Sequence, residues 1–142
     1  MLLLNALCLC SFAGTRRAFV IGIGEYEDPA WGKIHGVRDA WAVAGMLREN
    51  GFRDLFVLVG REATKAAIVA QFELLAGCCE TGDTVYVHFS GHGQLMTDVD
   101  GDESDGWDES WIPYDACRKY CPRDRGERHL CDDEINVLLT SV

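Results

Sequence analysis

The run Val85–Phe89, which leads directly into Ser90-Gly91-His92-Gly93, constrains the fold more than any other feature of the chain. The run is apolar and rich in β-branched and aromatic residues, which is typical of a buried strand, and the two glycines allow the backbone to turn sharply after it. His92 would then lie at the carboxyl end of a strand, the edge at which open α/β sheets place their chemistry. We therefore expect a functional histidine, with an ordinary histidine in a turn as the alternative.

Two further apolar runs, Ala18–Ile23 and Leu55–Val59, have strand length and end at glycines. The segments between the three runs have apolar residues at helical spacing. The first helix has Val37, Trp41, Ala44 and Leu47 on one face and ends at Asn50-Gly51, and the second is capped by Thr64, with Ile68, Phe72 and Leu75 on one face. Strands that alternate with helices of this length predict an α/β protein with a mainly parallel sheet.

The carboxyl-terminal third of the chain has a weaker pattern. Residues 91–130 show no sustained periodicity, so we expect a long functional loop with a short hairpin near Trp111–Tyr114. A last helix is expected to start with Asp132 as its cap and to turn Ile135, Leu138 and Leu139 inward.

Composition limits the class of protein. A chain of 142 residues is long enough for one domain, and its net charge of −10 arises largely from seven acidic residues within 98–109. This local acidity argues against nucleic acid and anionic membranes as partners. The seven cysteines, an odd number that includes adjacent Cys78-Cys79, favour reduced thiols and a cytoplasmic protein. Residues 1–16 are expected to form an apolar extension too short to span a bilayer, with a signal peptide over residues 1–14 and secretion as the alternative.

Four blocks of sequence, taken in order, resemble the caspase-like cysteine peptidases and, among them, the metacaspases. They are Arg17–Gly24, Arg38-Asp39-Ala40, His88–Gly93 with the acidic segment after it, and Asp132-Asp133-Glu134-Ile135. They are similar to the family's first strand, its Asn-Asp-Ala helix start, its catalytic-histidine segment and the helix before its nucleophile strand. The resemblance implies a caspase-like α/β/α sandwich over residues 17–142 and a cysteine-type endopeptidase that acts on peptides or proteins.

The same resemblance assigns roles to residues. It implies that His92 takes the thiol proton and then protonates the leaving amine, and that the Gly93 N–H binds the oxyanion. Asp39 and Ser90 would receive a substrate Arg or Lys side chain. Asp39 could instead stabilise the helix dipole, and Lys33 lies near the position of an arginine that animal caspases use to bind Asp. A basic P1 residue is the reading we favour.

The family's nucleophile lies on a strand after the last helix, and the chain ends at Val142. We therefore expect a partial domain that lacks the C-terminal strands and is inactive in isolation. The exposed edge of Val85–Phe89 would then favour self-association. The alternative is a non-catalytic caspase-like module that binds peptides or regulates an active homologue.

The acidic residues and the cysteines near the carboxyl terminus are candidate metal ligands. Asp98, Asp100, Asp102 and Glu109 have the spacing of an EF-hand, but Glu103 stands where that loop needs glycine, so an EF-hand is excluded. The family resemblance implies a different calcium site, an activator not needed for the chemistry, with a solvated acidic loop as the alternative. Its ligands here would be Asp108, Glu109, Asp132 and Asp133. The set Cys117, Cys121, His129 and Cys131 lacks a common zinc spacing, and free thiols are expected.

Overall fold

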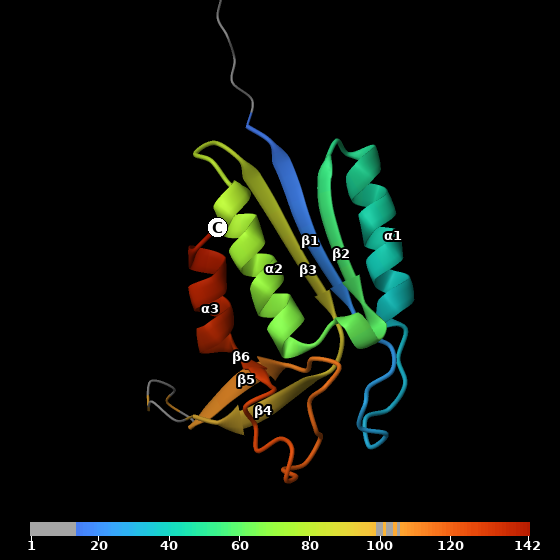
Figure 1. Cartoon of the computed structure of the whole chain (residues 1–142), viewed down its shortest axis with the longest axis vertical. Coiled ribbons are helices and arrows are strands. Elements are labelled where there is room, and N and C mark those ends of the chain that lie inside the picture. The colour runs from blue at the N-terminus through green and yellow to red at the C-terminus, as the bar shows by residue number, and fades with distance from the viewer. Residues whose placement is uncertain (1–13, 99–100, 102–103, 105) are drawn as a thin grey trace, which may run out of the picture.

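A three-stranded parallel sheet forms the centre of the molecule (Figure 1). The computed structural model describes residues 14–98, 101, 104 and 106–142. The strands are β1 (Arg16–Gly22), β2 (Asp54–Val59) and β3 (Thr84–Ser90), in the order β2-β1-β3. β1 pairs in parallel with both neighbours, so that Phe19 lies opposite Phe56 and Val87. The predicted parallel sheet is confirmed.

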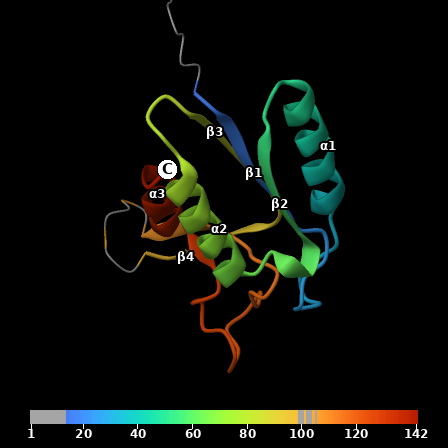
Figure 2. The same ribbon diagram turned by 45° about the horizontal axis from the view of Figure 1, so that its top comes forward.

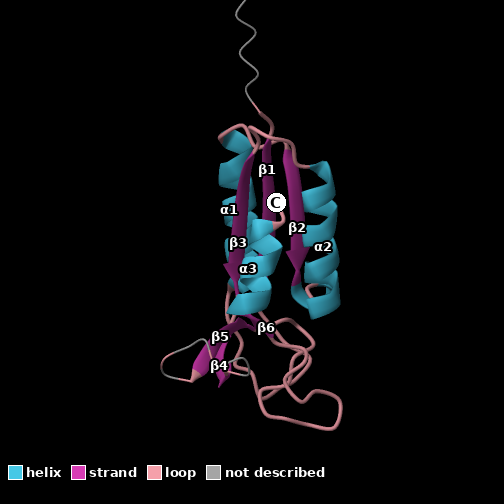
Figure 3. Ribbon diagram, turned by 90° about the vertical axis from the view of Figure 1, so that its left-hand side faces the viewer, coloured by secondary structure: helices cyan, strands magenta, loops and turns pink. Residues whose placement is uncertain are grey.

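Helices cover both faces of this sheet. Figure 2 shows α1 (Gly36–Glu49) on one side of the strands and α2 (Lys65–Cys78) with α3 (Asp132–Thr140) on the other, while Figure 3 shows the layers edge-on. A short 3-10 turn (Gly60–Glu62) joins β2 to α2. Alternate residues of β1 face opposite layers: Phe19 and Ile21 pack in the cluster that contains Phe72, and Ala18 and Val20 in the cluster of α1. Both faces of β1 are buried, which explains its continuous apolar run.

The first helix packs closely against the sheet. A Cβ atom on Gly22 would lie 2.4 Å from the Gly36 carbonyl oxygen and 2.5 Å from the Ala40 Cβ atom. Only small side chains fit this contact, so Ala40 is buried, whereas Trp41, predicted to face inward, is 50% exposed. The predicted end of the helix is confirmed, since Gly51 has φ of +83° directly after the C-cap.

The second helix agrees with its prediction in full. The Thr64 hydroxyl accepts a hydrogen bond from the Ala67 N–H at 3.3 Å, as an N-cap does. Its predicted inward residues, Ile68, Phe72 and Leu75, are fully buried.

The third helix corrects two predictions. Its N-cap is Cys131 rather than Asp132, because the Glu134 carboxylate reaches back to the Cys131 N–H at 3.3 Å in a capping box. Ile135 is buried as predicted, but Leu139 is 43% exposed.

A second, antiparallel sheet lies below the carboxyl ends of the parallel strands (Figure 1). It consists of β4 (Gly93–Thr97), β5 (Trp107–Trp111) and β6 (Leu130–Cys131), in that order. The prediction of one long loop with a hairpin near Trp111–Tyr114 was wrong, since the hairpin joins β4 to β5 and starts directly after His92. Its buried positions mix apolar Met96 with polar Asp108 and Ser110, so no apolar alternation revealed it.

The predictions for the N-terminal segment and for the EF-hand involve residues outside the described ranges. The proposed extension or signal peptide falls largely on residues 1–13, and the EF-hand exclusion depends on residues 100, 102 and 103. In the ranges that are described, no helix is long and apolar enough to cross a membrane.

Candidate active site

His92 lies where the parallel sheet ends and the antiparallel sheet begins. The glycines beside it were expected to provide a sharp turn, but neither Gly91 nor Gly93 has positive φ. Gly91 is needed for space instead, since a Cβ atom there would lie 2.5 Å from Phe89 Cζ and 3.1 Å from the Tyr26 hydroxyl oxygen. The absence of a side chain allows Tyr26 to reach the backbone next to His92.

Two aromatic rings and one carbonyl hold the His92 side chain. The Trp31 and Tyr26 rings each lie 5.3 Å from the imidazole, with Trp31 stacked on it at an interplanar angle of 25°. The imidazole Nε2 lies 2.7 Å from the Gly32 carbonyl oxygen. A carbonyl only accepts hydrogen bonds, so Nε2 carries a proton, and in the neutral form of the ring the lone pair lies on Nδ1.

The residues around the ring are themselves fixed. The Tyr26 hydroxyl accepts a hydrogen bond from the His92 N–H at 2.7 Å, and the Trp31 indole N–H donates to the Ala116 carbonyl at 2.9 Å. Burial raises the pKa of the Tyr26 phenol, which keeps it neutral near pH 7. The imidazole is therefore positioned from two separate segments, the loop after β1 and the loop after β5.

The register of β4 decides where the Gly93 N–H points. Gly93 lies opposite Trp111, and the Ile112 N–H donates to the His92 carbonyl at 3.0 Å. Neighbouring pairs alternate in an antiparallel ladder, so Gly93 and Trp111 form a pair without mutual hydrogen bonds. The Gly93 N–H consequently points away from β5 and is directed toward the outer edge of the sheet.

Asp39 and Ser90, which the sequence assigned to one pocket, are brought together. The Ser90 hydroxyl donates to Asp39 Oδ2 at 3.4 Å. The close packing of α1 produces this contact, because a Cβ atom on Gly36 would lie 2.3 Å from the Ser90 carbonyl oxygen. Asp39 is half exposed, and Arg38 lies 3.9 Å from its carboxylate.

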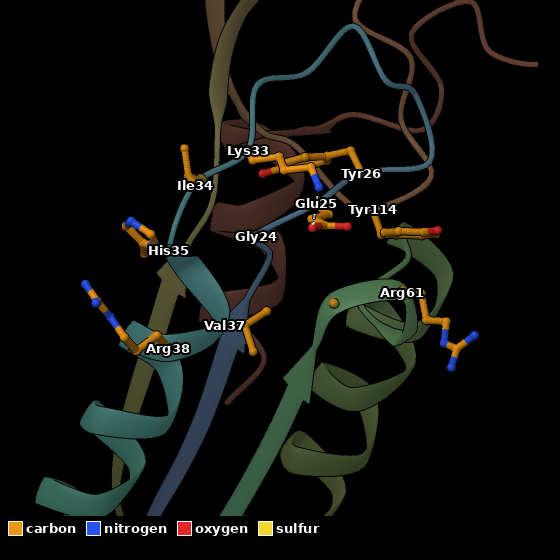
Figure 4. A pocket seen from close by; sticks show the side chains of 11 residues that line it. Gly24, Glu25, Tyr26, Lys33, Ile34, His35, Val37, Arg38, Arg61 and Tyr114 are labelled. Atoms are coloured by element: carbon orange, nitrogen blue, oxygen red, sulfur yellow. Dashed lines mark hydrogen bonds and ion pairs between the residues drawn. The ribbon is translucent and has the colours of Figure 1, made fainter.

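A cleft of 730 Å³ opens at the carboxyl ends of β1 and β2, and Tyr26 is shared between the cleft and the surroundings of His92 (Figure 4). Lys33 and Glu25 form an exposed ion pair at 2.8 Å on its wall. In Figure 4 the side chains of Arg38 and Arg61 extend away on opposite sides. Asp39 and Ser90 are not among the lining residues, so the cleft is distinct from the predicted P1 pocket.

The predicted calcium ligands come from two neighbouring elements. Asp108 and Glu109 are on β5, and Asp132 and Asp133 are in the first turn of α3. Asp108 and Asp132 both lie close enough to Cys131 to add to the effect of burial, which raises the pKa of that thiol. No group of three His, Cys, Asp or Glu side chains in the described ranges could hold a metal ion. Calcium binding by these residues stays a prediction.

The sequence did not identify Tyr26, Trp31 or Gly32 as site residues. The sequence contained one indication of their role. Tyr26 and Trp31 are aromatic and follow the first strand, at the edge of the sheet where the active site was expected. The five cysteines of the described ranges, Cys78, Cys79, Cys117, Cys121 and Cys131, are free thiols. The hydrogen bond and ring contacts of the His92 side chain in the described ranges are with Gly32, Tyr26 and Trp31, and none of them involves a cysteine.

Comparison with known proteins identifies the family. The profile of the metacaspase, peptidase C14 domain matches residues 16–142. The chain belongs to the metacaspase family. The relationship inferred from the four sequence blocks is thus confirmed, together with the α/β fold class of the caspase-like sandwich.

Among fungal relatives, Metacaspase-1A of Aspergillus oryzae is 32% identical over 138 residues, covering 90% of this chain and 30% of its own length. Metacaspase-1B of Aspergillus fumigatus is 32% identical over 136 residues, or 89% of this chain and 31% of its own. The crystal structure of protein GSU0716 from Geobacter sulfurreducens is similar with a TM-score of 0.71 and 29% identity, covering 89% of this chain and 45% of that one. The chain thus spans about a third of the length of these metacaspases.

Proposed function

We propose that this chain provides the general base, the oxyanion donor and part of the P1 pocket of a caspase-like cysteine endopeptidase. The observation that carries the proposal is the orientation of His92. Its Nε2–H is held by the Gly32 carbonyl, so Nδ1 is left to accept a proton. Membership of the metacaspase family supports a peptidase of the caspase-like type with peptide or protein substrates.

The first half of the proposed reaction, which ends with the substrate acyl group on the cysteine before water releases it, uses His92 twice. Nδ1 first takes the proton of a cysteine thiol, and the thiolate attacks the scissile carbonyl carbon. The carbonyl oxygen gains negative charge, which the outward Gly93 N–H stabilises. The protonated imidazole then gives its proton to the departing amine as the peptide bond breaks. The stacked Trp31 and Tyr26 rings keep the imidazole in place for both transfers.

In this proposal the nucleophile is a cysteine other than the five described ones. The support is that no described cysteine takes part in the hydrogen bond or ring contacts of the His92 side chain. We accordingly expect the isolated chain to hydrolyse no peptide.

We further propose a basic P1 residue, since Asp39 and Ser90 present a carboxylate and a hydroxyl side by side. The separate cleft is lined by three cationic residues, Lys33, Arg38 and Arg61. Substrates with an acidic P1 residue should therefore be tested as the alternative to a basic P1 residue. We also propose that calcium activates this peptidase, and the support is the group of carboxylates near Cys131. A cytoplasmic location is proposed as well, and the support is that the described cysteines are free thiols.

We also propose that two copies of the chain associate through the edge of β3. β3 is one of the two outer strands of the described parallel sheet, and its sequence contains neither Lys nor Pro. Size-exclusion chromatography with light scattering should show a species larger than a monomer. Tyr86→Lys, at a position 38% exposed, should shift it toward the monomer. A monomeric parent chain would exclude pairing through this edge.

A chimera tests the catalytic proposal. Residues 16–142 replace the matching segment of Aspergillus oryzae Metacaspase-1A, and hydrolysis of fluorogenic peptides ending in Arg, Lys or Asp is measured. We expect cleavage after Arg and Lys, loss of activity in His92→Ala, and selective loss of affinity for basic P1 residues in Asp39→Asn. His88→Gln, four residues earlier on β3, is the matched control and should remain active. A folded chimera without activity, with cooperative thermal unfolding as the criterion of folding, contradicts the proposal.

A further inference from the structure

Cys117 and Cys121 lie together in the loop between β5 and β6, where the carboxylate of Asp124 organises the backbone. Asp124 is fully buried, and its Oδ2 accepts a hydrogen bond from the Cys117 N–H at 2.6 Å. Cys121 and Asp124 form an isolated bridge, with their backbone hydrogen bonds at 2.8 and 3.1 Å. The two cysteine backbones are therefore held against the same residue, four positions apart in sequence.

The side chains of this pair lie near each other as well. Each thiol is close enough to change the pKa of the other, and the Arg123 guanidinium is close enough to affect both. Arg123 is held in turn by Glu27, whose carboxylate lies 2.5 Å from Arg123 Nη1. The loop therefore holds two thiols and a cation close together, which is an arrangement suited to thiol chemistry.

We propose that Cys117 and Cys121 are a modification site, a dithiol that a peroxide oxidises to a disulfide and a reduced dithiol restores. The disulfide would shift residues around His92 and so regulate the candidate active site. This regulatory role rests on the proposed function. The structure contains the reduced form.

The two cysteines differ in the way that such a reaction requires. Cys121 is partly exposed, and the hydrogen bond from Cys117 lowers the pKa of its thiol, with further contributions from Arg123 and the Asp124 N–H. Cys117 is only 4% exposed, and burial raises the pKa of its thiol. Cys121 is therefore the residue that reacts first, and Cys117 is the one that resolves the product.

The chemistry balances as a two-electron oxidation. The Cys121 thiolate attacks one peroxide oxygen, the O–O bond breaks, and a sulfenic acid and hydroxide form. The Cys117 sulfur then attacks the Cys121 sulfur, its thiol proton leaves with the hydroxyl group as water, and the S–S bond forms. In total, two thiols lose two electrons and two protons, and one hydrogen peroxide becomes two waters.

The neighbours of Cys117 connect this site to His92. Ala116 accepts the hydrogen bond of the Trp31 indole, and the Arg118 guanidinium lies 5.8 Å from the centre of the Trp31 ring. The Arg118 N–H also donates to Asp28 at 2.8 Å, in the loop that carries Trp31. Formation of an S–S bond of about 2.05 Å must draw Cys117 toward Cys121. That shift moves both contacts of Trp31, whose ring stacks on the catalytic imidazole.

Peroxide treatment of the 142-residue chain, followed by alkylation and proteolysis without reductant, tests the disulfide. Cleavage before Asp115 and after Arg118, Lys119 and Arg123 should leave the Cys117 and Cys121 peptides joined, and dithiothreitol should separate them. In Cys117→Ser the oxidised Cys121 should instead be trapped by dimedone as a sulfenic acid. The double variant Cys78→Ser with Cys79→Ser, which retains the pair, should behave like the parent chain.

Two further measurements separate this site from ordinary thiol oxidation. Arg123→Gln should slow the reaction with peroxide several-fold because it removes the cation beside both thiols, whereas Arg125→Gln in the same loop should not. The NMR resonance of the Trp31 indole N–H should shift on oxidation of the parent chain and stay unchanged in Cys121→Ser.

Peroxide that leaves Cys117 and Cys121 unlinked, or that joins either of them to another cysteine, overturns the modification site. A disulfide that leaves the Trp31 resonance in place overturns the link to His92. Neither readout uses peptidase activity, so an inactive chimera would reject the proposed function without affecting this result.

Discussion

The parallel sheet and the region that follows His92 share an apolar core but differ in their buried polar side chains. In the sheet, Phe19, Ile21, Ile68 and Phe72 are fully buried apolar residues packed between the layers. In the region from residue 93 to residue 131, all four buried polar or charged side chains of the described ranges are found. These are Asp108, Ser110, Asp124 and His129. His92 lies at the junction of the two regions.

This difference assigns separate tasks to the two regions. Apolar burial is non-directional and stabilises the whole domain, whereas hydrogen bonds to a buried carboxylate fix particular atoms in place. The loops around His92 need fixed positions, because Trp31 is held through Ala116 and Arg118. The contrast predicts that substitutions in the sheet change global stability and substitutions in the loop region change local order.

The largest effect is expected for Phe72→Ala. Phe72 is fully buried, with its ring edge-on to Phe19 at 5.2 Å, so truncation leaves a cavity in the core and should cost about 3–5 kcal/mol of unfolding free energy. Urea denaturation followed by circular dichroism measures this. Leu74→Ala, two residues away and 62% exposed, is the control and should change stability by less than about 0.5 kcal/mol. Similar losses for both variants would contradict the assignment of the core.

A smaller, local effect is expected for Asp124→Asn. The Asp124 carboxylate accepts hydrogen bonds from the N–H groups of Cys117, Gly126 and Arg128, at 2.6, 2.9 and 3.2 Å. Loss of the charge should cost about 1–3 kcal/mol. Hydrogen exchange should accelerate at these three amides and not in β1. The exposed Glu127, which bonds the Arg125 N–H in the same loop, provides the control Glu127→Gln. Uniformly faster exchange across β1 would show that the two regions are one unit.

The pH dependence of the loop region follows from His129, which is 1% exposed. Burial lowers its pKa, and Lys65 adds to this while Asp124 opposes it. The unfolded chain takes up a proton near pH 6.5 and the folded chain does not, so stability should fall as the pH decreases below about 6.5. His129→Leu should flatten this dependence in denaturation curves recorded between pH 5 and 7.5. An unchanged slope in the variant would assign the dependence to other groups.

The smallest effect concerns calcium. If Asp108, Asp132 and Asp133 bind a calcium ion in the folded state, millimolar calcium should raise the melting temperature, and zinc should not replace it. Since no metal group is complete in the described ranges, we expect a weak effect of about 1 kcal/mol or less. Calorimetry of the parent chain and of Asp132→Asn with Asp133→Asn compares the two. A shift that survives both substitutions removes these residues from the site.

The sequence predicted the sheet better than the loop region for a physical reason. The strands and α2 have periodic apolar residues, so Phe19, Ile68 and Phe72 could be placed in the core from their spacing alone. Trp41 was misplaced because the close contact of Gly22 with Gly36 is a tertiary property that helical periodicity does not contain. The hairpin of β4 and β5 and the buried residues Asp124 and His129 were not predicted, because buried polar residues that depend on tertiary contacts have no periodic signal.

The candidate site shows the same division. The motifs identified His92, Gly93, Asp39 and Ser90, and the structure brings Asp39 and Ser90 into contact. They did not identify the residues that orient the imidazole, since Gly32 acts through its carbonyl and Trp31 through its ring face. Such roles depend on distances between segments far apart in the sequence.

The protonation of the His92 ring tests the central claim most directly. Nitrogen-15 NMR of the 142-residue chain near neutral pH distinguishes the two neutral imidazole tautomers, and comparison with His92→Ala assigns the signals. The geometry predicts a proton on Nε2, bonded to the Gly32 carbonyl, and an unprotonated Nδ1 ready to accept the thiol proton. A ring that carries its proton on Nδ1 would contradict the role of His92 as the general base.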